Sequence, residues 1–267
     1  MSKSNAIKTF RDLLAFLTII PIGSGEDFVA ISAEYMFLFP LMGGLIGLFA
    51  AGYFLLSGFI VSGLLGFVNS LIQVPADFLL RLALAIMTLA FVLVLTGLQH
   101  FDGLVDLGNA IGLRRLEERR EAAHAWIVTY KGAFLAIFVE FLAFLGLFFI
   151  NAGMAVRVII VAEVAAKLGM VTIMAVGQPT SKGLGARFMV KAKRKRNVIA
   201  YVIAFVVAVP LLGWAGLLVV AVSVLSGVLM EQVGRSVFGG VSGDMIGATN
   251  ESARAVTLVL LAGVLAL

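Results

Sequence analysis

Residues 79–106 decide the fold of this chain, and they read LLRLALAIMTLAFVLVLTGLQHFDGLVD. The part from Leu79 to Leu98 is an apolar run about as long as the roughly 20 residues that a helix needs to cross a bilayer. An acidic motif with Asp102 and Asp106 follows this run directly. The sequence therefore predicts a membrane-spanning helix that leads into two carboxylates at the membrane surface.

The composition of the whole chain agrees with a membrane location. Of its 267 residues, 61% are hydrophobic and 13% are charged, whereas a soluble domain has about 45–50% apolar and about 25% charged residues. The absence of cysteine excludes disulfides, thiolate metal sites and cysteine nucleophiles. A net charge of +5 is typical of basic cytoplasmic loops, so we expect the lipid bilayer and no nucleic acid as a partner.

Apolar runs predict an all-α, polytopic integral membrane bundle of six or seven spans, which forms one domain over residues 1–267. The expected spans are Tyr35–Val61, Leu79–Leu98, Ala133–Ile150, Ala155–Val176, Val198–Leu212, Trp214–Met230 and Arg254–Leu267. The fifth and sixth, joined at Pro210–Gly213, form either a tight hairpin or one bent, re-entrant pair. The seventh is too short to cross a bilayer upright.

Basic residues predict the orientation. They gather before the first span and in the intervals 99–132, 177–197 and 231–253, which we expect to be cytoplasmic loops. The opposite loops, Ser62–Phe78 and Asn151–Met154, contain no Lys or Arg. We therefore expect a multi-pass protein of the cell membrane whose acidic motifs face the cytoplasm together.

The first 24 residues predict an interfacial amphipathic helix over 1–24. Ile7, Phe10, Leu14 and Leu17 recur at helical spacing with charged residues between them. A signal peptide is the alternative, but Asp12 interrupts the apolar segment and no small-residue cleavage site follows.

The acidic motif after the second span is typical of a magnesium site. In a helix, Asp102, Asp106 and Asn109 project from one face, and two carboxylates at this spacing repel unless a cation lies between them. Mg²⁺ takes oxygen ligands and keeps several waters, which leaves room for phosphate oxygens. Gly103 would leave the adjacent surface open to a bulky ligand. The alternative is a solvated helix end with two incidental acids.

A second motif, GGVSGDMIGATNE over Gly239–Glu251, combines glycines with Asp244 and Glu251. Glycine-rich turns at helix starts present backbone amides to anions, so Gly243 is a candidate phosphate contact. A flexible loop is the alternative reading. The sequence has no Walker-type phosphate loop.

Several single residues are weaker candidates. Glu163 and Lys167 lie four apart inside the fourth span, as a structural ion pair or a substrate contact, and Glu140 lies in the third span. His100 is either a general base or a residue that orients the acidic motif. The pattern Gly43-x-x-x-Gly47 predicts close helix packing, within the chain or between copies in a homo-oligomer.

These stretches together resemble the cobalamin synthase family, the adenosylcobinamide-GDP ribazoletransferases, and its archaeal members in particular. The resemblance covers nearly the whole chain and rests on Phe16–Ile22, Glu34–Gly44, Thr96–Asp106, Ala162–Lys167, Gly183–Gly185 and Gly239–Glu251.

The resemblance implies a magnesium-dependent transferase of the last steps of cobalamin biosynthesis. A ribose hydroxyl of α-ribazole, or of its 5′-phosphate, would attack the phosphate attached to cobinamide in adenosylcobinamide-GDP, and GMP would leave. The implied metal ligands are Asp102, Asp106 and Asp244, which with His100 are also the implied catalytic residues. The implied substrate contacts are Gly103, Glu34, Glu163, Lys167, Gly243 and Glu251.

Two departures from the family pattern stand out. Asn109 and Ala125 occupy positions where the family usually has acids, so we expect Asn109→Asp and Ala125→Asp to raise turnover. The alternatives are a divergent member without the activity, a CDP-alcohol phosphotransferase and a membrane transporter. The phosphotransferase pattern fails at Asp106 and Leu107, where it needs Ala and Arg.

Overall fold

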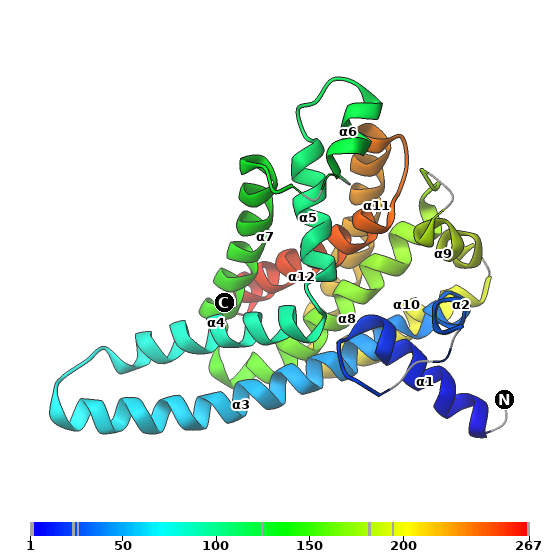
Figure 1. Ribbon diagram of the computed structural model, residues 1–267. Coiled ribbons are helices and arrows are strands. Elements are labelled where there is room, and N and C mark those ends of the chain that lie inside the picture. Colours follow the sequence, from blue (N-terminus) through cyan, green and yellow to red (C-terminus); the bar gives the residue numbers. More distant parts are fainter. Residues whose placement is uncertain are drawn as a thin grey trace.

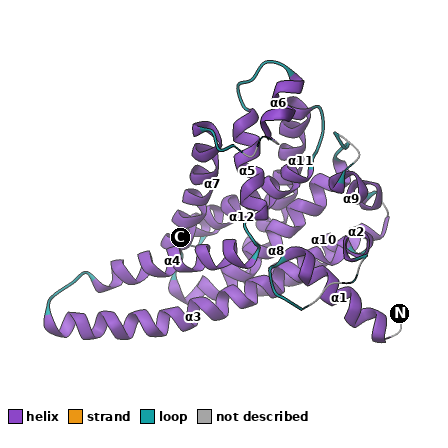
Figure 2. Cartoon of the chain, viewed as in Figure 1, coloured by secondary structure: helices purple, strands orange, loops and turns teal. Residues whose placement is uncertain are grey.

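The computed structural model describes residues 3–22, 25, 27–123, 125, 127–180, 183–193 and 195–265, which form a helical bundle without strands (Figure 1 and Figure 2). The α-helices are α1 (Lys3–Leu17), α2 (Phe28–Glu34), α3 (Phe39–Leu71), α4 (Ala76–Leu95), α5 (Gln99–Ala110), α6 (Leu116–Ala123), α7 (Tyr130–Phe149), α8 (Ala152–Val176), α9 (Leu184–Ala192), α10 (Val198–Leu212), α11 (Trp214–Phe238) and α12 (Gly243–Val264). Short 3₁₀ turns, η1 (Met36–Leu38) and η2 (Lys195–Asn197), precede α3 and α10.

Within the residues that the structure describes, six helices are long and apolar enough to cross a membrane, which confirms the polytopic all-α prediction. They are α3, α4, α7, α8, α10 and α11. The expected seventh span is corrected, because its helix α12 begins at Gly243 rather than Arg254 and its first half carries polar residues. Gly213, with φ +58°, joins α10 to α11 as the tight hairpin that was one of the two expectations.

Helix α8 is the centre of the bundle. It is buried along almost its whole length, whereas the other five spans bury about a third of their apolar windows or less. Helix α3 lies directly against it at the predicted Gly43-x-x-x-Gly47 pattern. A Cβ at Gly43 would overlap the backbone of Glu163, and one at Gly47 would overlap the backbone of Ile160. The pattern therefore serves packing within the chain.

Helices α3 and α4 form a long hairpin whose turn projects away from the other helices (Figure 1). The expected external loop Ser62–Phe78 is wrong in extent, because α3 runs to Leu71 and α4 starts at Ala76. Its glycines did not end the helix, since a chain in a bilayer satisfies its backbone amides best by staying helical. With 33 residues, α3 is about 50 Å long at 1.5 Å per residue.

The three intervals expected to be cytoplasmic loops are also largely helical. The first contains α5 and α6, the second contains α9, and the third, 231–253, is non-helical only at residues 239–242. Helix α6 is fastened to the end of α11, where Arg119 and Arg120 donate hydrogen bonds to the carbonyl oxygens of residues 236–238. Basic side chains at a helix C-terminus satisfy carbonyls that lack a partner within the helix.

The N-terminal segment contains the expected helix, α1, but its apolar residues divide between two environments. Leu14 and Leu17 are buried in the core, whereas Ile7 and Phe10 are exposed. Asp12, which interrupts the apolar segment, is buried and accepts hydrogen bonds from Arg11 and from the backbone amide of Gly25.

Candidate active site

Three carboxylates line one cavity on the face that α5 and α12 share. Asp102 and Asp106 lie one turn apart on α5, and Asp244 lies in the first turn of α12. The cavity measures about 330 Å³, and its remaining walls include Ala123 at the end of α6 and Ile127 and Val128 from the segment between α6 and α7. The structure therefore brings together the three acids that the sequence analysis assigned to a metal.

A close helix crossing holds these acids in place. A Cβ at Gly103 would overlap the backbone carbonyl of Asp244, and one at Gly247 would lie 3.1 Å from the Cα of His100. Gly103 is thus buried in the crossing, whereas the sequence analysis expected it to leave an open surface for a ligand. Glycines at both contacts let the backbones of α5 and α12 touch, which fixes the positions of the carboxylates.

The three carboxylates repel one another. Burial, followed by the negative charges of Asp244 and Asp102, raises the pKa of Asp106 to about 7. A cation placed among them would relieve this repulsion and favour the ionised form of Asp106. The acidic cavity is therefore suited to a positively charged ligand.

The side chains of the acidic cavity fit a Mg²⁺ ion that keeps part of its water shell. All three side chains offer oxygen ligands, which this ion prefers, and the cavity has room for water. Among the described residues, however, no three His, Asp or Glu side chains lie close enough to ligate one ion together. The residues fit a hydrated ion held by one or two carboxylates and completed by substrate oxygens, which is the usual form of a magnesium site.

The N-terminus of α12 adds a potential anion contact beside the acids. Ser242 caps the helix by accepting a hydrogen bond from the amide of Met245, and its hydroxyl also donates to Asp244. Gly243 is exposed, and no neighbouring atom lies within 4 Å of the space a Cβ would fill. Backbone amides of a first helical turn attract phosphate oxygens. Gly243, the first residue of α12, is therefore placed as expected for a phosphate contact.

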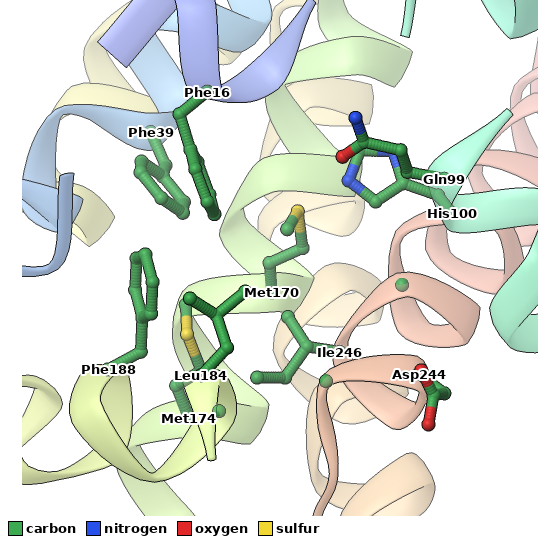
Figure 3. Close-up of a pocket in the computed structure, with 13 residues that line it drawn as sticks. Phe16, Phe39, Gln99, His100, Met170, Met174, Leu184, Phe188, Asp244 and Ile246 are labelled. Carbon is green, nitrogen blue, oxygen red and sulfur yellow. The ribbon is translucent and has the colours of Figure 1, made fainter. Parts of the chain in front are cut away.

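A second cavity of about 200 Å³ adjoins the acidic one and shares Asp244 with it. Figure 3 shows the phenyl rings of Phe16, Phe39 and Phe188 at one end of this cavity and Asp244 at the other. His100 lies on the side from which α5 enters. We call this the aromatic cavity; the sequence analysis did not identify it.

His100 joins the aromatic cavity to the protein interior. Burial, followed by the positive charges of Lys167 and Arg254, holds the pKa of His100 well below its usual range. Its Nδ1 lies 3.8 Å from Oε1 of Glu251 and has no hydrogen-bond partner within the described part of the chain. A neutral imidazole with Nδ1 turned towards a carboxylate leaves Nε2 as the nitrogen available to a substrate.

Glu163, Lys167 and Glu251, three of the predicted substrate contacts, lie in a buried ionic network, which is the structural alternative expected for the pair Glu163 and Lys167. Arg254 pairs with both Glu163 and Glu251, while Lys167 lies 3.6 Å from Glu163 and donates to Asn250 at 2.7 Å. All five side chains are at most 2% exposed, and the two acids balance the two bases. The network lies behind the cavities and supports α8 and α12, with Glu251 reaching His100.

Two further predicted residues lie away from the three acids. Glu34 ends α2 and pairs with Lys191, at 2.7 Å, and with Arg196, so it links α2 to the segment around α9. Glu140 is buried on α7, facing the interior as expected for a charge in a span.

Asn109 lies outside the acidic cavity, contrary to the idea that it replaces a metal-ligating acid. Its Nδ2 donates to the carbonyl of Ile127 at 2.7 Å, and its Oδ1 accepts from both the amide and the hydroxyl of Thr129. Asn109 therefore holds the segment that walls the cavity. Ala125 is exposed in that segment, between Ala123 and Ile127, while its neighbours His124 and Trp126 lie outside the described residues.

Sequence reasoning missed several residues because only the tertiary structure reveals their roles. Arg254 stands at the start of an expected span, and its position three residues after Glu251 is the sequence signal for an ion pair. Phe16, Phe39 and Phe188 are far apart in sequence and looked like ordinary core residues.

Comparisons with known proteins agree with the resemblance. The cobalamin-5-phosphate synthase family pattern matches residues 9–262. An adenosylcobinamide-GDP ribazoletransferase of Methanocella arvoryzae is 28% identical over 98% of this chain and 97% of its own length. Proteins of the same name from Halorubrum lacusprofundi and Thermococcus onnurineus are each 29% identical over 94% of this chain and 95% and 96% of their own lengths. No solved structure matches the chain.

Proposed function

Because the chain belongs to the cobalamin-5-phosphate synthase family, we propose that its two adjoining cavities carry out the reaction for which its relatives are named. The protein is a membrane transferase that joins α-ribazole, or its 5′-phosphate, to adenosylcobinamide-GDP. The products are adenosylcobalamin, or its 5′-phosphate, and GMP. The observation that carries this proposal is the shared position of Asp244, where an acidic cavity for phosphates meets an apolar cavity for an organic group.

The bond changes are those of a substituted-phosphate transfer. A ribose hydroxyl oxygen forms a bond to the phosphorus attached to cobinamide, and the bond from that phosphorus to the bridging oxygen of GMP breaks. The hydroxyl proton passes to Nε2 of His100, and GMP leaves with the electron pair of the broken bond. The low pKa of His100 means that its imidazole is neutral before the step, and the negative charge of bound phosphates would favour its protonation.

Glu251 acts on this step through His100. Its Oε1 lies 3.8 Å from Nδ1, so it favours the tautomer that carries a proton on Nδ1 and leaves Nε2 free to accept. Arg254, which pairs with Glu251, keeps that carboxylate in place. Glu251 and Arg254 are positioning residues in this scheme.

Asp102, Asp106 and Asp244 would hold Mg²⁺ with the substrate diphosphate. When bound, the ion would offset the charge of the phosphates and of the departing GMP. The three carboxylates alone would repel an anionic diphosphate, and the exposed amides at the start of α12 would attract it.

The cell membrane is the proposed location, with both cavities facing the cytoplasm. Helices α5, α6 and α9, which border the cavities, belong to intervals rich in Lys and Arg, whereas the turn between α3 and α4 at residues 72–75 has neither. The positive-inside rule places the former in the cytoplasm. The transporter alternative depends on charged residues inside the spans, such as Glu163 and Lys167. Their ion pairs in the buried network give these charges a structural role instead.

The test is turnover by the purified protein in detergent, with adenosylcobinamide-GDP and α-ribazole and with or without Mg²⁺. We expect magnesium-dependent release of GMP, and Asp102→Asn should abolish it, while the exposed acid variant Glu117→Gln on α6 should retain it. Activity unchanged by chelation would refute the metal assignment. Absence of GMP release from adenosylcobinamide-GDP, both with α-ribazole and with its 5′-phosphate, would refute the transferase.

A further inference from the structure

The aromatic cavity contributes His100 and Asp244 to the phosphate chemistry described above, but its phenylalanine end has no role in that step. We infer that it holds the planar heterocyclic base of the ribazole, and that Phe16, Phe39 and Phe188 select this base. The inference rests on the proposed function and adds the place and the recognition of one substrate.

The three phenylalanines are supplied by three separate helices. Phe16 lies on α1, Phe39 begins α3, and Phe188 lies on α9. The rings of Phe16 and Phe188 have centroids 5.1 Å apart and planes inclined by 25°, and the ring of Phe39 lies about 6 Å from both. The ring of Phe16, which is only partly buried, offers an apolar face on which a planar ring can stack, and the buried rings of Phe188 and Phe39 pack against it.

The volume of the aromatic cavity limits its occupant. At about 200 Å³ it is below the roughly 300–1,000 Å³ of pockets that hold drug-sized ligands. A fused two-ring heterocycle is of suitable size, whereas a corrinoid macrocycle is far too large. The corrinoid must therefore stay outside, which leaves the base of the nucleophile or the guanine of GDP as aromatic occupants.

Polarity favours the base of the nucleophile over guanine. The aromatic end is lined by phenyl, Leu184 and methionine side chains, and the polar side chains Gln99, His100 and Asp244 lie away from it (Figure 3). Guanine has hydrogen-bonding groups along its edge that would be left unsatisfied there, at a considerable cost. A benzimidazole-type base presents mostly carbon.

The arrangement also places the reacting group correctly. A base stacked on the phenylalanines points its ribose towards His100 and Asp244 at the other end of the cavity. A ribose hydroxyl there would meet the proposed proton acceptor and the acidic cavity at once. Stacking of the base therefore orients the nucleophile.

The test measures KM separately for the two substrates in Phe188→Ala and Phe16→Ala. We expect KM for α-ribazole to rise roughly tenfold or more in each, as for loss of a base-stacking ring, with KM for adenosylcobinamide-GDP unchanged. The Ala variants should also accept ribazoles whose base carries an additional ring. Phe16 is only partly buried, so its variant keeps the test informative if Phe188→Ala does not fold.

Met189→Ala is the matched control. Met189 follows Phe188 on α9 and is 1% exposed, but it does not line the aromatic cavity. It removes a comparable buried side chain from the same helix, so we expect KM for α-ribazole to stay within about twofold of the unaltered protein.

Three results would overturn the inference. A rise in KM for adenosylcobinamide-GDP alone would place guanine in the cavity. An equal rise in KM for α-ribazole in Met189→Ala would show that the phenylalanine rings only pack the interior. If the unaltered protein shows no turnover, the proposed function fails, and calorimetric binding of α-ribazole then decides the inference by itself. Equal affinity of the unaltered protein and Phe16→Ala for α-ribazole would refute it.

Discussion

Gly103 lies so close to Asp244 that a Cβ on the glycine would overlap the carbonyl oxygen of the aspartate. This contact makes α5 and α12 one rigid unit at the point where each contributes carboxylates. The acidic cavity therefore depends on a residue that has no functional group.

Replacing Gly103 with Ala should separate the two helices and cost activity. A displacement of about 1 Å in a catalytic group can lower the rate about a hundredfold, so we expect a loss of this order in GMP release. Gly63→Ala is the control, because no atom lies within 4 Å of its Cβ position in α3. Full activity in Gly103→Ala would show that the crossing does not set the carboxylates.

Asn109→Asp should lower stability and should not raise turnover, which reverses the expectation from the sequence. An aspartate cannot donate to the carbonyl of Ile127, and an unsatisfied buried group costs about 1–3 kcal/mol. Thermal unfolding in detergent measures the effect. Asn151→Asp should be neutral, because Asn151 uses only its acceptor oxygen to cap α8.

Ala125→Asp, in contrast, should lower the magnesium concentration needed for half-maximal turnover. Ala125 is exposed between Ala123 and Ile127, which wall the acidic cavity, so we expect a carboxylate there to add negative charge near the bound ion. Ala125→Asn adds similar volume without charge and should have a smaller effect. An equal magnesium dependence in the unaltered protein, Ala125→Asp and Ala125→Asn would show that residue 125 does not contribute to the metal site.

The affinity for Mg²⁺ should increase with pH through neutrality. The pKa of Asp106 is raised to about 7, so below this pH the ion must displace a proton and its affinity falls about tenfold per pH unit. Titration calorimetry from pH 6 to pH 8 measures this dependence. In Asp106→Asn we expect weaker Mg²⁺ binding and a smaller change of the affinity with pH. Affinity that is constant over this range in the unaltered protein would contradict the assignment.

The same pKa predicts how the metal-free protein responds to pH. In the folded protein Asp106 keeps its proton up to about pH 7, whereas in the unfolded chain it loses the proton near pH 3.8. The protonated carboxyl therefore contributes to the free energy of unfolding fully below about pH 4, and this contribution is lost as the pH rises to 7. Added Mg²⁺ should therefore stabilise the protein more at pH 8 than at pH 6.

Glu163→Gln should destabilise the protein strongly and leave the KM of both substrates unchanged. Breaking a buried ion pair leaves an uncompensated charge, which costs about 3–5 kcal/mol, and Glu163 pairs with the buried Arg254 and Lys167. Arg115→Gln breaks an exposed pair with Glu118 and should cost less than about 1 kcal/mol. A large rise in KM with normal stability would instead favour substrate contact by Glu163.

Much of the fold could be predicted because bilayer crossing is a local property of the sequence. The runs around Leu79–Leu98 and Ala155–Val176 are long and apolar, and a bilayer leaves such segments no conformation other than a helix. Helix ends were predicted less well. The sequence predicted a loop over 231–253, yet only residues 239–242 of this interval are non-helical, and Gly247 is needed inside α12 to let His100 approach.

The sequence by itself determined the membrane class, the family and the acidic residues, because hydrophobicity and short motifs are carried by neighbouring residues. Only the tertiary structure decided that Glu163 and Glu251 turn inward to Arg254, and that Asn109 binds the backbone of Ile127 and Thr129 rather than a ligand. It also brought together Phe16, Phe39 and Phe188. Such relationships depend on how closely helices cross, and that distance is set by side-chain volumes at contacts between residues far apart in the chain.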